Sequence, residues 1–215
     1  MSDMKTAMRL IVMVSGIGSG LLRLIRACEQ KELKAEIVAV GSDRHAPALS
    51  HASDYGIPFF VSPFKEYSNR DAWGANLLNT VLAYKPDLVV LSGFMRILPS
   101  CVVDALSPNL INTHPSYLPE FPGMNAVEDA LRAGVKTTGA SVIRVDNGID
   151  TGPVISQMRV KVYSSDTCQT LHSRIKKVEH LLLCRAIKNI YTEQFILKNL
   201  LHNSVRRPSG KTGDR

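Results

Sequence analysis

Short apolar runs alternate with amphipathic segments along the first half of the chain. Runs rich in β-branched residues over 8–15 and 36–40 predict strands buried on both faces, the segment 57–62 leads into a third strand, and 87–92 predicts a central strand. Between them, the spacing of apolar side chains predicts helices after Gly20, over 51–56 and over 69–84, with Gly56 and Pro86 as helix-ending residues. This alternation predicts an α/β fold with right-handed βαβ units and a Rossmann-like, mostly parallel sheet flanked by helices.

The second half has a different pattern. A short strand over 110–113 runs into His114, a loop rich in Pro and Gly follows over 115–123, and a helix is predicted over 126–133. Strands over 138–145 and 154–162 flank the loop 146–153, which predicts an antiparallel extension of the sheet. A long amphipathic helix over 166–190 comes next, with Asp166 as its predicted N-cap.

The domain organisation follows from these patterns. We expect one domain over 8–190, preceded by a disordered extension over 1–7. The C-terminal extension over 191–215 is expected to be disordered from about residue 203, where Pro, Gly, Ser and basic residues gather.

Composition narrows the class of protein. The 215 residues are 45% apolar, with a mean hydropathy of +0.00, and no apolar run reaches the ~20 residues of a membrane span. Met1–Arg9 has no apolar core of a secretory signal, and the four cysteines are far apart. These features favour a cytoplasmic protein with free thiols, no metal site and no membrane partner.

The net charge of +7 is concentrated partly in the C-terminal tail. The remaining basic balance suits small phosphorylated or carboxylated substrates, and it lacks the basic stripe with interleaved aromatics that is typical of a nucleic-acid binder. A solvated basic face without a ligand is an equally good interpretation of composition alone.

The glycine loop Gly16–Gly20 follows a strand and opens a helix. Its backbone N–H groups and the helix N-terminus could hold a phosphate. Leu21 occupies the sixth position, so the loop does not complete G-x-G-x-x-G, and dinucleotide binding is not favoured. A tight structural turn remains the alternative.

Asn112, His114 and Asp150 are the candidate catalytic residues. Asn112 and His114 alternate along a strand, so their side chains point the same way, and Asp150 lies in a glycine-flanked loop that could return to them. An amide, an imidazole and a carboxylate can together bind an oxyanion and move a proton. A buried core histidine and an ordinary hairpin turn are the alternatives.

Four ordered motifs carry a resemblance. The stretches 93–98, 112–119, 121–123 and 148–153 read Gly-Phe-Met-Arg-Ile-Leu, Asn-Thr-His-Pro-Ser-Tyr-Leu-Pro, Phe-Pro-Gly and Gly-Ile-Asp-Thr-Gly-Pro. Their order and spacing, over about 8–190, resemble the folate-dependent formyltransferase family, most closely its member in purine biosynthesis. The resemblance implies that the amine of glycinamide ribonucleotide attacks the formyl carbon of the co-substrate 10-formyltetrahydrofolate.

The resemblance also implies roles for individual residues. Asn112 and His114 would stabilise the oxyanion, His114 being kept cationic by Asp150, and Asp150 would assist proton transfer through an ordered water. The substrate phosphate would bind Gly18, Ser19, Gly20 and Lys176, and Glu179 would hold the ribose hydroxyls. The folate site would comprise Arg70, Met95, Arg96, Ile97, Leu98 and Val145. The alternatives are a surface ion pair for Lys176 and Glu179, a solvated side chain for Arg70, and core packing for residues 95–98.

Two positions depart from the family pattern. The phosphate loop has Ser19-Gly20 where the family usually has a side-chain amide, and Ile143 stands where the family usually has a histidine. We expect a slower enzyme rather than an inactive one.

Three other functions remain open. Methionyl-tRNA formyltransferase normally carries a further C-terminal RNA-binding domain and typically has Asp where this chain has Pro153. Formyltetrahydrofolate hydrolase usually adds an N-terminal regulatory domain. A phosphate-binding module without catalysis is the alternative from another class. The sequence is compatible with a monomer or a homodimer, since the helix at 69–84 could be a dimer face or part of the core.

Overall fold

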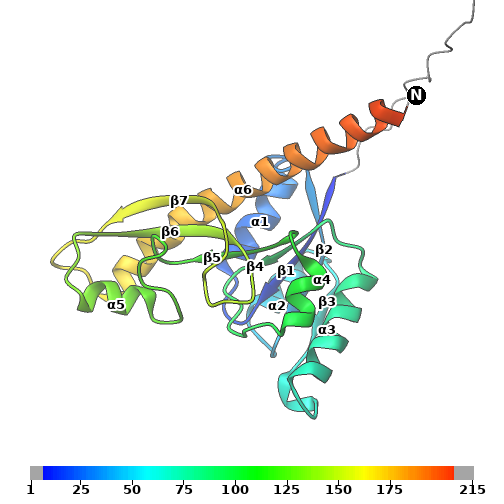
Figure 1. Ribbon diagram of the computed structural model, residues 1–215. Helices are drawn as coiled ribbons and strands as arrows, with labels where there is room; N and C mark the ends of the chain where they lie inside the picture. Colours follow the sequence, from blue (N-terminus) through cyan, green and yellow to red (C-terminus); the bar gives the residue numbers. More distant parts are fainter. Residues whose placement is uncertain (1–6, 206–215) are drawn as a thin grey trace, which may run out of the picture.

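A single mixed sheet of seven strands organises the protein. The computed structural model describes residues 7–205, with side chains described as far as 194. The strand order is β3-β2-β1-β4-β5-β6-β7. The strands are β1 (Met8–Val14), β2 (Ala35–Ser42), β3 (Phe59–Val61), β4 (Leu88–Leu91), β5 (Leu110–His114), β6 (Thr137–Arg144) and β7 (Val154–Lys161). β1 to β5 pair in parallel and β6 and β7 add antiparallel, so the predicted architecture is confirmed (Figure 1).

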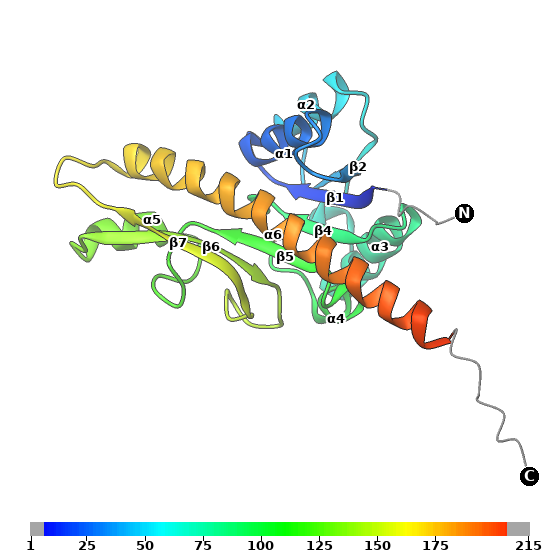
Figure 2. The ribbon, with the colours of Figure 1, turned by 90° about the horizontal axis from the view of Figure 1, so that it is seen from above.

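Helices cover both faces of the sheet. They are α1 (Ser19–Glu29), α2 (Ala48–Asp54), α3 (Arg70–Ala83), α4 (Ser100–Leu106), α5 (Ala126–Arg132) and α6 (Cys168–Val205), with a short 3₁₀ turn η1 (Phe64–Glu66). Figure 2 shows α1, α2 and α6 along one face. Alternate residues of β1 supply the two cores: Leu10 and Val12 pack with α1, α2 and α6, and Ile11 and Met13 pack with α3 and α4.

The predicted helices over the first half need small corrections. α2 begins at Ala48, earlier than the predicted residue 51, and Gly56 with φ +65 lies just beyond its end. α3 agrees closely with the prediction: Asn69 caps it by accepting a hydrogen bond from Ala72 N. α4 was missed, because its seven residues include Val102 and Val103, and two adjacent β-branched residues in so short a segment give little helix signal.

The last helix differs from its prediction at both ends. Thr167, rather than Asp166, is the N-cap, since Thr167 Oγ1 accepts from Thr170 N and the helix begins at Cys168. The Asp166 carboxylate instead accepts from Tyr163 N and binds Arg174 at 2.7 Å. The helix continues past the predicted end at residue 190 to Val205, and the sequence 191–205 contains no Gly or Pro to stop it. Disorder was predicted over 1–7 and from about residue 203; residues 203–205 instead belong to α6, and 1–6 and 206–215 lie outside the described residues.

α3 packs its apolar side into the second core through Trp73, Leu77 and Val81, each about 1% exposed. This side of α3 is therefore ordinary packing. Among residues 7–205, no helix has the length and apolar character needed to cross a membrane. The four cysteines are free thiols.

Candidate active site

A cavity of about 640 Å³ opens at the carboxyl ends of the parallel strands. Ligands of open α/β sheets bind at this edge. The glycine loop before α1, the segment after β4, the end of β5, the 146–150 loop and one side of α6 line the cavity. It therefore receives nearly every residue that the sequence nominated, from elements far apart in the chain.

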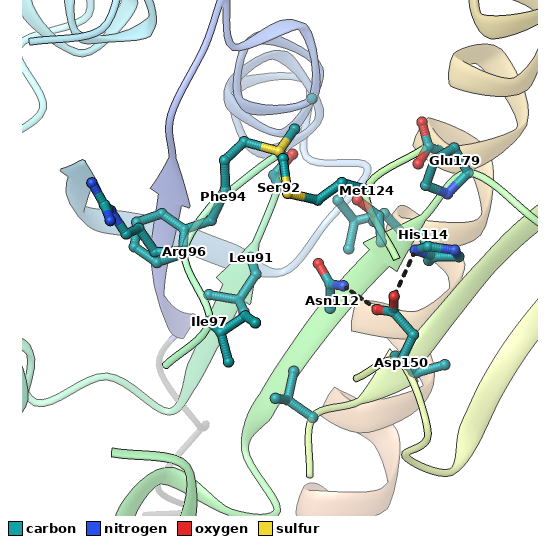
Figure 3. Close-up of a pocket in the computed structure, with 18 of the residues that line it drawn as sticks. Leu91, Ser92, Phe94, Arg96, Ile97, Asn112, His114, Met124, Asp150 and Glu179 are labelled. Atoms are coloured by element: carbon teal, nitrogen blue, oxygen red, sulfur yellow. Dashed lines mark hydrogen bonds and ion pairs between the residues drawn. The ribbon is translucent and has the colours of Figure 1, made fainter. Parts of the chain in front are cut away.

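Asn112, His114 and Asp150 meet in the middle of this cavity (Figure 3). Asn112 Nδ2 lies 3.4 Å from Asp150 Oδ1, and His114 Nδ1 lies 3.3 Å from Asp150 Oδ2. The other ring nitrogen of His114, Nε2, lies 2.9 Å from the carbonyl oxygen of Phe121. A ring with both nitrogens protonated can donate to both oxygens, whereas a neutral ring can donate to only one of them.

The loop 146–153 is shaped to present Asp150. Asp150 has φ +54, a left-handed conformation that Asp tolerates better than most residues. Gly123 N donates to its Oδ2 at 2.8 Å, which ties the loop to the Pro- and Gly-rich segment after β5. Gly152 has to lack a side chain, because a Cβ there would lie 1.8 Å from the carbonyl oxygen of Arg144. A backbone N–H group thus holds the carboxylate from one side.

One side of α6 forms a second wall of the cavity. His172, Lys176, Glu179 and His180 recur at helical spacing and all line it. Burial raises the pKa of the Glu179 carboxyl to about 7, although the charge of Lys176 lowers it. Burial, followed by the charge of Lys176, lowers the pKa of His172. Ionisable side chains of α6 therefore lie opposite the glycine loop.

The glycine loop faces this wall with unused hydrogen-bond donors. Gly18, with φ +80, is the N-cap of α1, and no side chain makes a capping hydrogen bond at this end of the helix. The first helical bond runs from Leu22 N to Gly18 O, so the N–H groups at the start of α1 have no partner within the helix. Partial positive charge at this helix end favours an anion.

The segment after β4 forms the opposite end of the cavity. Met95 and Ile97 are 57% and 60% exposed, so the alternative of core packing is wrong for Ile97, whereas Leu98 is buried. Arg96 and Val145 also line the cavity. Figure 3 shows Arg96 and Ile97 on the side of Asn112 away from Glu179.

Asp43, which the sequence reasoning missed, anchors this segment from beneath. Its side chain is fully buried, and Oδ2 lies 2.6 Å from Arg44 Nη2 and 3.3 Å from Arg96 Nε. Ser15 hydrogen-bonds to the same carboxylate, and Ser15 Oγ accepts from Met95 N at 2.8 Å. Burial alone would raise the pKa of Asp43, but the hydrogen bonds from Arg44, Ser15 and Arg96 outweigh it and lower the pKa.

Arg70 has a different setting from the one expected of a residue in the folate site. Arg70 is not among the residues that line the cavity; its Nη2 donates to the carbonyl oxygens of Ile97 and Leu98 at 2.7 and 3.3 Å. It therefore supports the exposed segment from outside. Ile143 lines the cavity directly opposite Asn112 in the β5–β6 register and is 2% exposed.

Comparison with known proteins identifies the family of this chain. The sequence pattern of formyl transferases matches residues 8–187, most of the chain. The chain belongs to the formyl transferase family. All the residues that line the cavity fall within the matched range.

Relatives of this formyl transferase chain agree over nearly the same range. Phosphoribosylglycinamide formyltransferase of Mycobacterium tuberculosis (strain CDC 1551 / Oshkosh) is 43% identical over 184 residues, covering 86% of this chain and 85% of the relative. The enzyme of the same name from Escherichia coli K12 is 36% identical, covering 81% and 83%. The crystal structure of glycinamide ribonucleotide transformylase 1 from Symbiobacterium toebii superposes with a TM-score of 0.82 at 36% identity, covering 85% and 86%.

Proposed function

We propose that this formyl transferase moves the formyl group of 10-formyltetrahydrofolate to the amine of glycinamide ribonucleotide, a step of purine biosynthesis. The observation that carries the proposal is the convergence of Asn112 and His114 on Asp150, both within 3.4 Å, in a cavity that is open on either side of them. The relatives that match most of both chains carry the same activity in their names.

The cavity has room and chemistry for a substrate at each end. The start of α1, with Gly18, Ser19 and Gly20, and Lys176 across from it would bind the phosphate of the ribonucleotide. Glu179, nearer the triad, would accept hydrogen bonds from the ribose hydroxyls. The apolar side chains of Met95, Ile97, Leu98 and Val145 would hold the folate ring, with Arg96 beside them and Arg70 supporting the segment.

Asn112 supplies the direct contact to the developing oxyanion. The amine nitrogen forms a bond to the formyl carbon, and the carbonyl oxygen takes up the negative charge. Asp150 Oδ1 accepts one N–H of the Asn112 amide, which leaves the other N–H of that group to donate to the substrate. A donor held in place before the reaction stabilises charge without having to reorganise.

Asp150 and His114 serve the second half of the reaction. A proton has to leave the amine nitrogen and reach the folate nitrogen before the bond from that nitrogen to the formyl carbon breaks. The Asp150 carboxylate, through an ordered water, would carry it. His114, between Asp150 and the carbonyl of Phe121, supports the charge and fixes the carboxylate rather than donating directly to the oxyanion.

The intact geometry counts against a module that binds phosphate without catalysis, since such a chain has no reason to hold three reactive groups together. The decisive experiment incubates the protein with 10-formyltetrahydrofolate, with and without glycinamide ribonucleotide, and follows tetrahydrofolate release. Release that depends on the ribonucleotide is expected. Release without it would indicate a hydrolase, and no release under either condition would refute the transferase.

A further inference from the structure

The hydroxyl of Ser92 and the bare backbone of Gly20 form an interlocking pair at the phosphate end of the cavity. Ser92 follows β4, and Gly20 lies in the first turn of α1, so the two come from neighbouring parts of the fold that are distant in sequence. A Cβ at position 20 would lie 2.2 Å from Ser92 Oγ, far inside van der Waals contact. Both residues line the cavity.

Backbone conformation does not explain the glycine. Gly20 lies inside α1 and, unlike Gly18, does not have a left-handed φ. Within a helix, glycine is less favourable than alanine by up to about 1 kcal/mol. Glycine at this position therefore lowers helix stability, and its missing side chain leaves the space that Ser92 Oγ occupies.

The Ser92 hydroxyl is free to bind a ligand. Within the described part of the chain its oxygen makes no hydrogen bond, although Ser92 N donates to Met13 O and so fixes the backbone. The same Cβ position at Gly20 is 4.0 Å from His180 Nε2 on α6, so both the Ser92 hydroxyl and His180 lie close to the start of α1. A serine hydroxyl there can donate to a phosphate oxygen alongside the helix N–H groups.

We propose that Ser92 is a phosphate-binding residue of this enzyme, and that Gly20 is a glycine in order to leave the Ser92 hydroxyl in its place. The proposal rests on the proposed function, because it assigns a new contact to the same substrate. It also accounts for the departure from the family pattern at Gly20: the missing side chain in the helix is replaced by a hydroxyl that reaches over from the neighbouring strand end.

The test compares Ser92→Ala, Gly20→Ala and the double variant. A hydrogen bond to a charged group is worth enough for Ser92→Ala to raise the KM for glycinamide ribonucleotide about tenfold, with kcat and the folate KM nearly unchanged. Gly20→Ala should raise the same KM by a similar factor, because its methyl group displaces the hydroxyl, while melting at or above the wild-type temperature. Ser173→Ala, at an exposed position of α6 outside the cavity, is the matched control and should leave every constant unchanged.

The double variant separates this proposal from simple space-filling. If Gly20 serves the hydroxyl, then Gly20→Ala adds little in a Ser92→Ala background; multiplied effects, or an unchanged KM in either single variant, would overturn the proposal. Binding of ribose 5-phosphate, measured by calorimetry, repeats the comparison without turnover. A wild type that binds this probe but forms no product would contradict the proposed function alone, whereas a variant series with uniform binding would contradict only the role of Ser92.

Discussion

Replacing Asp150 with Asn tests the centre of the site with the smallest change of shape. Asn is compatible with φ +54, so the loop should keep its path, and one side-chain oxygen remains. Asp150 Oδ2 accepts from Gly123 N at 2.8 Å and also faces His114, so the amide oxygen should take this position. The new NH₂ group then faces Asn112 Nδ2, donor against donor.

The conflict is relieved if the Asn112 amide turns over, which rotates its N–H away from the position set for the oxyanion. Loss of an oxyanion donor costs about 10²- to 10³-fold in kcat, and loss of a proton-transfer group about 10²- to 10⁴-fold. Groups that act as a unit do not have multiplicative effects. We therefore expect kcat to fall about 10³-fold, ~4 kcal/mol of transition-state stabilisation, with the KM for the ribonucleotide within about threefold of wild type.

The assay measures tetrahydrofolate formation at saturating 10-formyltetrahydrofolate while the ribonucleotide is varied. Asp129→Asn, at a partly exposed position of α5 and paired only with Arg132 among the side-chain contacts described, controls for the loss of one carboxylate charge and should behave as wild type. A kcat within tenfold of wild type would refute the catalytic role of Asp150. A loss of ribonucleotide affinity as large as the loss of kcat would show that the carboxylate serves binding instead.

Three further predictions follow from buried or paired carboxylates. Burial raises the pKa of Glu179 in the folded protein to about 7, so ionisation of this carboxyl should lower the stability of the fold as pH rises from the ordinary carboxyl range through 7. Glu179→Gln should therefore raise the melting temperature at pH 8 more than at pH 5, and it should weaken ribonucleotide binding. Asp43→Asn should raise the folate KM several-fold and spare the ribonucleotide KM, because it releases Arg96 and Ser15 beneath the cavity, and equal changes in both KM values would argue against a local effect. The hydrogen bonds from Arg174 lower the pKa of Asp166, so the stability that the Asp166 carboxylate contributes should be present at neutral pH and lost as pH falls below the ordinary carboxyl pKa. The difference in melting temperature between wild type and Asp166→Asn should therefore disappear on acidification. A difference that persists at low pH would contradict this coupling of protonation to stability.

The strands and the shared side of Asn112 and His114 were predictable because both depend on short-range periodicity. Apolar runs fixed four of the parallel strands, and alternation along β5 placed Asn112 and His114 on one side. The ends of the helices were harder to predict from the sequence. Asp166 and Thr167 are both good capping residues, and only the position of Arg174, which binds Asp166, leaves Thr167 to cap the helix.

The parts of the site that escaped prediction depend on contacts between distant segments. Asp43 reaches Met95 N only through Ser15, and nothing in the local sequence around any of the three residues signals that chain. His172 could have been found from its helical spacing to Lys176, a signal that was present in the sequence. The fit of Ser92 against Gly20 has no sequence signal at all, because it is set by how α1 packs beside β4.

Ile143 and His114 together explain why the orientation of one amide matters so much here. In the β5–β6 register Ile143 lies opposite Asn112, and residues so paired have side chains on the same face, so the wall beside the amide is apolar. Both ring nitrogens of His114 already face oxygen atoms, of Asp150 and Phe121, which leaves neither directed at a substrate. We therefore infer that direct hydrogen bonding from the triad to the proposed oxyanion falls to Asn112, which lies beside the apolar side chain of Ile143. The two oxygens of Asp150 consequently divide the work: one aligns the Asn112 amide, and the other holds His114 and the loop.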